Sequence, residues 1–408
     1  MEAEKTNQSA RWLVNEGLRG TPEKELIEGF CEKLGEAGFP LMRGSVIQRT
    51  LHPVIAGHGF EWNDDGNGVI QESWQRAVDE TGRDWGKSPF YHMLSGSIPK
   101  MREHLAKTNE PSAFPLINKL RERGATDYLA YVNPYAEHDK FGDAGGMISS
   151  WTARGGEGFT DEQVDSLEDL LRLMALAFKG AANFRIARTL LEIYLGRDAG
   201  RRVIKGDIVR GSVETIRAVL WYSDLRGFTK IAESLPSQEL IQFLNDYFEC
   251  LVDPVHERGG QVLKFMGDSV LATFPVEDTP NVCRTALDAT DDALKRVQAL
   301  NERRKADGLV TTDIYVAMHL GDVMYGNIGS RERLDFTVVG PAVNEVTRIE
   351  DMCRTLEQAV VISSAFATAA GGCTDRLVSL GRYALRGVRQ PQELFTLVRQ
   401  DVYETVTI

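Results

Sequence analysis

The sequence of 408 residues has few cysteines, an excess of acidic over basic side chains, and no long apolar run. Only five residues are cysteine, and none forms a C-x-x-C pair. Scattered thiols in odd number favour reduced cysteines over a disulfide framework or a zinc site, and we therefore expect a cytoplasmic protein. The five positions are Cys31, Cys250, Cys283, Cys353 and Cys373.

Positive charge is also in short supply. Lysine and arginine number 47 against 59 acidic residues, which gives a formal net charge of −12. Such a molecule repels a polyanion, and no basic stripe offsets this, so nucleic acid is excluded as a partner. A bound nucleotide would need a local cluster of metal ions and basic side chains.

Long apolar segments are absent as well. No window approaches the roughly 18 apolar residues that a membrane helix needs, and the start MEAEKTNQSARW lacks the features of a signal peptide. We therefore expect no membrane partner. The composition, 42% hydrophobic and 26% charged, is typical of a globular protein, and the length favours two domains.

The first half of the chain reads as mixed α+β. A helix is expected over 22–37, with Thr21 as its N-cap and Pro22 as its first residue. Apolar, β-branched and aromatic runs flanked by glycine predict strands; they cover 45–51, 125–136 and 145–153.

A long amphipathic helix should follow Thr160, which is placed to cap it with Gln163 in the first turn. Its apolar stripe is Val164, Leu167, Leu170, Leu171, Met174 and Phe178. A few strands, followed by the segment GFTDEQVDSLEDLL and a long helix, resemble the GAF family of sensor domains over about residues 20–180. A PAS-like or unrelated α+β sensor is the alternative. The histidines of this half show no metal or haem spacing, and its tryptophans are more commonly explained as aromatic core than as a pocket lining, so its ligand stays unidentified.

A second helix is expected from about residue 184, followed by a connector rich in glycine and arginine. Ile186, Leu190 and Ile193 repeat at a spacing that suits a short parallel coiled coil, and equally a helix packed on its own domain. We place the domain boundaries at 1–180 for a regulatory domain, 181–212 for a helical linker and 213–400 for a catalytic domain.

Two segments after residue 217 carry candidate metal ligands. In AVLWYSDLRGFT an apolar strand ends on Asp224, which either caps a turn or holds a hard cation. The segment GGQVLKFMGDSVLATFP predicts a hairpin with Asp268 in its turn. Lys264, in the first strand, needs an acceptor or an anionic ligand unless it extends to solvent. Two aspartates on neighbouring turns can share a pair of Mg²⁺ ions.

A third segment, IYVAMHLGDVMYGNIGSRERLDFTVVGPAVNEVTRIEDM, predicts two strands and a helix that opens near Pro341. Asn344 and Arg348 stand four residues apart on that helix, so both project from one face. An amide and a guanidinium directed at one point suit a phosphoryl group that gains charge in a transition state.

The blocks WYSDLRGFT, LKFMGDSVLATF and FTVVGPAVNEVTRIE, in this order, resemble the three signature blocks of class III adenylyl and guanylyl cyclases. The resemblance covers about residues 213–400. It implies a ferredoxin-like α+β fold that forms active sites between two head-to-tail copies, and hence a homodimer. It assigns two Mg²⁺ or Mn²⁺ ions to Asp224, Asp268 and the carbonyl of Leu225.

The same resemblance assigns the remaining roles. Asn344 and Arg348 orient the ribose and stabilise the phosphate, while Lys264 and Thr337 read adenine, as in a bacterial Lys/Thr subgroup. Arg386 holds the terminal phosphates, with Arg389 as a competitor. A further phosphate-binding arginine of some relatives is replaced here by Asp322, which cannot play that part.

The implied reaction converts ATP to 3′,5′-cyclic AMP and pyrophosphate by in-line attack of the ribose 3′-hydroxyl. The proton goes to Asp224, a metal-bound water or the substrate phosphate. A catalytically inactive nucleotide-binding module and a guanylate cyclase are the alternatives. A diguanylate cyclase is disfavoured because the G-G-[DE]-E-F hairpin is missing. The regulator of the N-terminal domain, a small molecule or a protein, is not identified.

Overall fold

The structure is a computed structural model that describes residues 2–76, 85–107, 110–135, 145–279, 281–388 and 390–398. The chain divides into two compact units, Met1–Leu190 and Leu191–Ile408, and each has its own cores. Among the described residues, no helix combines the length and the apolar character required to cross a membrane.

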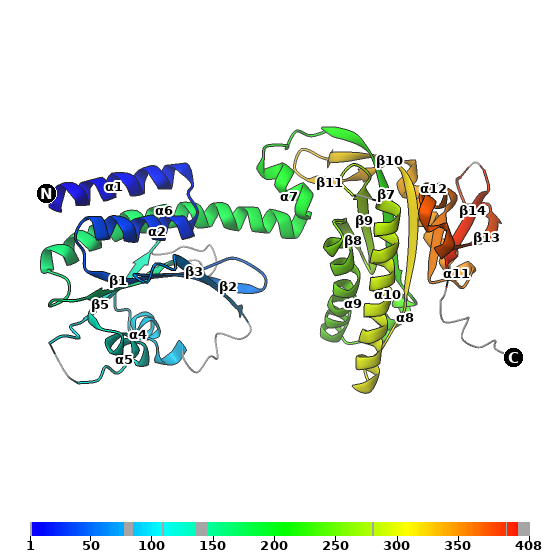
Figure 1. The fold of residues 1–408 in the computed structure, drawn as a ribbon. Coiled ribbons are helices and arrows are strands. Elements are labelled where there is room, and N and C mark those ends of the chain that lie inside the picture. The colour runs from blue at the N-terminus through cyan, green and yellow to red at the C-terminus, as the bar shows by residue number, and fades with distance from the viewer. Residues whose placement is uncertain are drawn as a thin grey trace. The chain divides into compact units, whose positions relative to one another are not determined.

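The first unit is built on a six-stranded sheet in the order β3-β2-β1-β6-β5-β4. Figure 1 labels four of these strands, β1, β2, β3 and β5. Every neighbouring pair is antiparallel. The strands confirm the three that the sequence predicts, namely β1, β5 and β6. The bounds are β1 Leu41–Arg49, β2 Ile55–Asn63, β3 Val69–Gln75, β4 Lys100–Glu103, β5 Ala125–Pro134 and β6 Gly146–Arg154.

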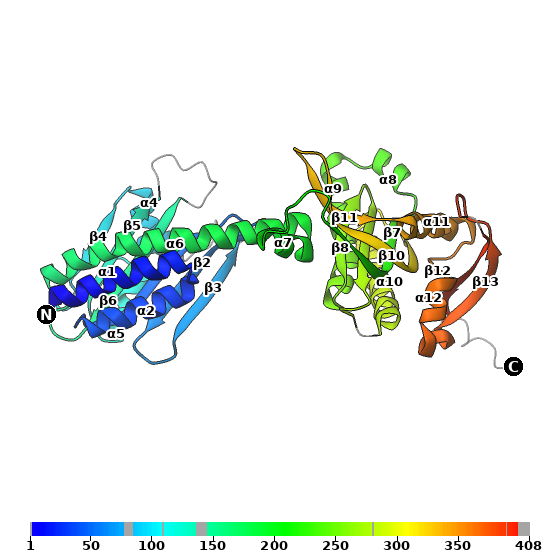
Figure 2. The ribbon, with the colours of Figure 1, turned by 90° about the horizontal axis from the view of Figure 1, so that it is seen from above.

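Helices cover both faces of this sheet. Three of them, α1 (Glu2–Arg19), α2 (Glu23–Glu36) and α6 (Asp161–Leu195), form one layer, which Figure 2 shows from above. The short helices α4 (Pro89–Ser95) and α5 (Pro115–Glu122), with the 3₁₀ turn η1 (Trp85–Lys87), border a smaller core on the other face. The GAF-like assignment of this α+β unit stays a prediction.

The start of α6 confirms the expected capping box. The backbone N–H of Gln163 donates to Thr160 Oγ1 at 3.2 Å, and the N–H of Thr160 donates to Gln163 Oε1 at 3.1 Å. The six apolar stripe residues are all buried. The prediction of a second helix from residue 184 is wrong, because α6 continues to Leu195 and the chain breaks only at Gly196, which has φ of 91°.

Two other details of the first unit correct the sequence reasoning. Thr21 does not cap α2; the N-cap residue is Pro22, and Thr21 Oγ1 donates instead to Glu16 Oε2 at 2.7 Å. Helix α1 was not expected, because its sequence is mostly polar. It is held by few apolar contacts, among them the fully buried Leu13.

The second unit is built on a larger sheet in the order β13-β14-β12-β10-β7-β9-β8, with β11 paired to β10. Its central strands, taken as β10-β7-β9-β8, have the 4-1-3-2 order of a ferredoxin-like fold, which confirms that prediction. The bounds are β7 Val213–Leu225, β8 Gln261–Met266, β9 Ser269–Pro275, β10 Ile314–Gly329, β11 Leu334–Val339, β12 Val360–Ser363, β13 Leu377–Tyr383 and β14 Gln392–Leu397.

Helices again cover both faces. The core on one face includes α9 (Ser237–Glu257) and α10 (Val282–Ala306), whereas α11 (Pro341–Thr355) packs on the other face. Buried Trp221 of β7 donates from Nε1 to Thr290 Oγ1 of α10 at 3.0 Å, which ties the sheet to that helix. The remaining elements are α7 Arg197–Ile204, α8 Phe228–Ser234, α12 Ser364–Ala369 and η2 Gly371–Arg376.

Candidate active site

Two carboxylates meet where β7 ends beside the β8–β9 hairpin. Asp224 lies one residue before the end of β7, and Asp268 lies in the turn after Gly267, whose φ of 67° favours glycine. The first residue of β9, Ser269, donates from Oγ to Asp224 Oδ1 at 2.7 Å. The backbone N–H of Leu225 donates to the Asp268 carboxylate, so the two turns are locked together.

The electric field at this point disfavours a further negative charge. Burial, and then the charge of Asp224, raise the pKa of Asp268 to about 6. Burial and the charge of Asp224 also raise the pKa of Glu350, on α11, to about 7. Sequence reasoning missed Glu350. Glu350 lies next to Ile349 and three residues before Cys353, and both of these are fully buried. That apolar helical spacing was the signal that could have indicated a partly buried carboxylate.

The donor set fits a hard cation. Among the described residues, no lysine, arginine or histidine forms an ion pair with Asp224 or Asp268. No positive side chain of the described part therefore offsets their mutual repulsion, and a divalent ion would relieve it. No group of three or more His, Cys, Asp or Glu side chains able to hold a metal occurs in the described part, so remaining ligands would have to be backbone, water or substrate oxygens.

A second group of predicted residues lies along β8 and β11. Lys264 on β8 is 31% exposed, and its Nζ contacts Asp335 Oδ2 on β11 at 2.8 Å. This is the acceptor that the lysine requires, and sequence reasoning did not name it. Thr337 lies two residues further along β11, on the same face of the strand, and is 8% exposed. Its Oγ1 is buried without a hydrogen-bond partner among the described residues.

The predicted pair on α11 projects as expected. Pro341 begins the helix, and the neighbouring buried residues Val346 and Ile349 turn the opposite side of the helix toward the sheet. Asn344 is exposed, and Arg348 is 43% exposed with its Nη1 at 3.2 Å from Asp351 Oδ2. An exposed ion pair of this kind is worth little, so the guanidinium is available to a ligand.

Two of the three remaining positions, Arg386 and Asp322, lie on exposed parts of the second unit. Arg386 is exposed in the turn after β13, and no described residue forms an ion pair with it. Arg389 lies outside the described residues. Asp322 lies on β10 at 3.5 Å from Arg217 Nη1, and both side chains are about 60% exposed.

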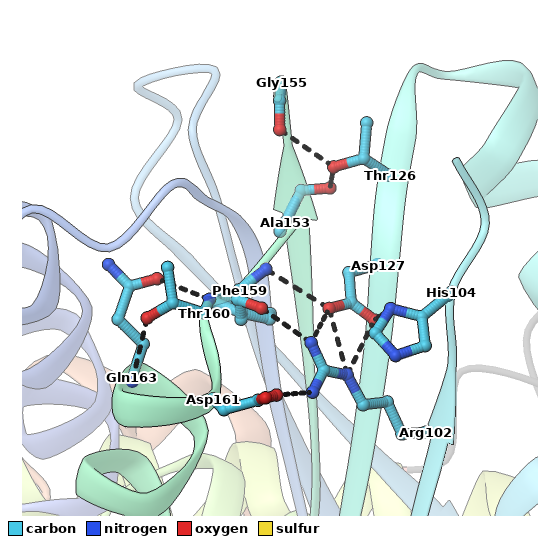
Figure 3. Close-up of polar contacts among 10 residues, drawn as sticks. All are labelled: Arg102, His104, Thr126, Asp127, Ala153, Gly155, Phe159, Thr160, Asp161 and Gln163. Carbon is cyan, nitrogen blue, oxygen red and sulfur yellow. Dashed lines mark hydrogen bonds and ion pairs between the residues drawn. The ribbon is translucent and has the colours of Figure 1, made fainter. Parts of the chain in front are cut away.

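The first unit contains a separate polar cluster, shown in Figure 3. Asp127 on β5 is fully buried and accepts from Arg102 Nη2 at 2.8 Å and from the backbone N–H of Phe159 at 3.2 Å. Arg102 also donates to the carbonyl of Phe159 at 2.6 Å and contacts Asp161 at 3.2 Å. The buried pair therefore fixes the start of α6 against β4 and β5. Nothing in the sequence pattern distinguished it.

Comparison with known proteins identifies the second unit. Residues 213–399 match the family described as adenylate and guanylate cyclase catalytic domain. An adenylate cyclase of Anabaena cylindrica is 32% identical over 148 residues, which are 35% of this chain and 29% of that protein. Adenylate cyclase 1 of Rhizobium meliloti is 32% identical over 149 residues, 35% of this chain and 22% of that protein. The chain thus spans less than a third of these two relatives.

Two solved structures show a partial likeness to this chain. The adenylyl cyclase CyaB from P. aeruginosa is 25% identical, with a TM-score of 0.42, over 47% of this chain and 98% of that one. The guanylyl cyclase Cya2 is 28% identical, with a TM-score of 0.41, over 46% of this chain and 96% of that one.

The family match falls on the part of the chain that carries the ferredoxin-like sheet, the paired aspartates and the Asn–Arg helix. Residues 213–399 therefore belong to the class III adenylate and guanylate cyclase family.

Proposed function

We propose that the chain is an adenylate cyclase that converts ATP to 3′,5′-cyclic AMP and pyrophosphate. The observation that carries the proposal is the pair Asp224 and Asp268, which the fold forces together without a compensating cation of its own. Holding two such carboxylates side by side at the ends of neighbouring strands costs free energy, and binding of divalent ions would offset that cost.

In this proposal Asp224, Asp268 and the carbonyl of Leu225 hold two Mg²⁺ or Mn²⁺ ions. When bound, such ions lower the pKa of an attacking hydroxyl and neutralise phosphate charge. The chain itself contributes a rigid support. Leu225 is buried, and Ser269 fixes the orientation of the Asp224 carboxylate by its hydrogen bond.

The choice of ATP rests on Lys264 and Thr337. An ammonium group can donate to adenine N1, an acceptor, whereas the corresponding N1 of guanine carries a hydrogen. The Thr337 hydroxyl is buried and unpartnered among the described residues, so it can accept from the exocyclic amine. Asp335 holds the Lys264 ammonium in place at 2.8 Å until the base arrives.

Phosphate handling rests on α11. Asn344 would orient the ribose, and Arg348 would stabilise the charge that develops on the α-phosphate, with Arg386 on the terminal phosphates. No hydrogen bond or ion pair in the described part joins Asp224 or Asp268 to Lys264, Thr337 or Arg348. In the homodimer that we propose, each site combines the metal set of one copy with the base and phosphate set of the other.

The first unit is proposed as the regulator of this domain. Helix α6 starts at the buried Asp127–Arg102 cluster and continues as one helix to Leu195, past the boundary between the units at Leu190. A ligand that moves that cluster would therefore act directly on the helix that enters the catalytic unit. The four cysteines with described side chains are free and buried, which suits the reducing cytoplasm.

The test is product formation by the purified full chain with ATP and Mg²⁺ or Mn²⁺, with Asp268→Ala beside it. The control variant is Asp307→Ala, at the exposed C-terminal end of α10. The proposal expects cyclic AMP from the parent chain and from the control, and loss of at least about a hundredfold in Asp268→Ala. Equal rates in all three proteins would reject the metal site.

A further inference from the structure

The second unit contains a cavity of about 530 Å³. It lies near the start of β7 and the end of β9, away from the paired aspartates. Arg217 and Val276 line it and are joined by a backbone hydrogen bond from the N–H of Val276 to the Arg217 carbonyl. Asp224 is seven residues further along β7, so the cavity and the carboxylates are separated by roughly 20 Å. The cavity therefore plays no part in the site described above.

The charge of the cavity is positive. Of the described residues that line it, the charged ones are Arg217 and Arg284. Arg284 is exposed and forms no ion pair with any described residue. Within the described ranges, the ion pair of Arg217 is the exposed contact with Asp322 at 3.5 Å, which is worth little in water. Two guanidinium groups are thus available to an anion.

The first turn of α10 adds to this potential. Asn281, in the left-handed region with φ of 48°, precedes the helix and makes no side-chain cap, and Asn281, Val282 and Arg284 all line the cavity. A helix of 25 residues carries partial positive charge at this end, which favours a bound anion.

The unpartnered hydroxyl of Thr279 is an independent indication that the cavity binds a ligand. It lines the cavity and is 5% exposed, yet its Oγ1 is buried with no hydrogen-bond partner among the described residues. A buried hydroxyl without a partner costs about 1–3 kcal/mol, so such groups are uncommon in folded proteins. A ligand oxygen would satisfy it.

The remaining wall is apolar. Val276, Val282, Leu320 and Ala370 contribute aliphatic side chains to the lining. A bare inorganic ion would leave this surface uncovered, whereas an anion with an apolar body would cover it.

We propose that this cavity is a binding site for a small organic anion, in which a carboxylate or phosphate group contacts Arg217, Arg284 and Thr279 and an apolar body covers the aliphatic wall. The site is independent of the cyclase reaction and does not require it.

The test uses three probes that share a phenyl ring: benzoate, phenyl phosphate and the neutral benzamide. Each is titrated at matched ionic strength into the full chain with labelled valine and leucine methyl groups, and the NMR signals of Val276, Val282 and Leu320 are followed. We expect saturable shifts with one or both anions and none with benzamide. The stronger anion identifies the carboxylate or phosphate preference.

The variants Arg284→Gln and Thr279→Val should weaken anion binding by at least about tenfold and about fivefold. Arg303→Gln, at the other end of α10, is the matched control and should bind as the parent chain does. Arg284 is exposed, so its replacement tests the site even if Thr279→Val fails to fold. Equal binding of benzamide, no shift with either anion, or unchanged affinity in Arg284→Gln would each overturn the proposal.

Discussion

If each active site takes its metal ligands from one copy and its phosphate-binding residues from the other, two inactive variants should restore activity in each other. Asp268→Ala damages the metal set, and Arg348→Ala damages the phosphate set. Each variant alone should lose at least about a hundredfold in rate, because every site in its homodimer carries the lesion. In a heterodimer of the two variants, one site carries both lesions and the other carries none.

The magnitude follows from this geometry. Heterodimers isolated with two different affinity tags should show about half of the parent rate, and an unfractionated equal mixture about a quarter, since half of its dimers are mixed. The assay is cyclic nucleotide formation after co-expression. Asp224→Ala with Asp268→Ala is the matched control, because both lesions lie in the metal set and no intact site can form. A heterodimer of Asp268→Ala and Arg348→Ala that stays at the level of its parents would refute shared sites.

Three predictions concern the first unit. Burial lowers the pKa of His58 to about 4, so the unfolded chain binds a proton that the folded chain does not. The contribution of His58 to the free energy of unfolding should fall by about 3 kcal/mol as the pH drops from 6.5 to 4, and His58→Gln should remove that part of the slope in denaturant titrations. Asp127→Asn should cost about 3 kcal/mol by the same measurement, against less than about 1 kcal/mol for Asp64→Asn, whose carboxylate pairs with a side chain that is 48% exposed. An equal cost would contradict the role of the cluster. Gly158→Ala should lower the melting temperature, since φ is 95° and a Cβ would lie 2.4 Å from the Cβ of Asp127; an unchanged value would show that the loop relaxes.

Local patterns in the sequence were sufficient for elements whose signals are close together in the chain. The capping residues Thr160 and Gln163 stand three positions apart, and the turn at Gly267 separates two short apolar strands. Both features depend on neighbours in sequence, so the helix start and the hairpin were predicted correctly.

Features that depend on distant residues were not predictable in this way. Lys264 and Asp335 are 71 positions apart, and only the pairing of strands in the folded sheet brings them together. Arg102 and Asp127 meet for the same reason, across β4 and β5. Glu350 has a raised pKa because of burial and then the charge of Asp224 on β7, and the sequence does not show that the folded sheet brings β7 close to α11.

The end of α6 shows how a local rule failed. The sequence pattern predicts a second helix from about residue 184. The structure keeps a single helix through Gly180 and ends it at Gly196, where a positive φ terminates the hydrogen-bonding pattern.

The central claim, that the second unit makes cyclic AMP, is tested most directly by competition between substrates. The purified full chain is given equimolar ATP and GTP with Mg²⁺ or Mn²⁺ in one vessel, and the cyclic products are separated and quantified by mass spectrometry. The account predicts that cyclic AMP is the main product. Cyclic GMP as the main product, or no cyclic nucleotide from either substrate, would contradict it.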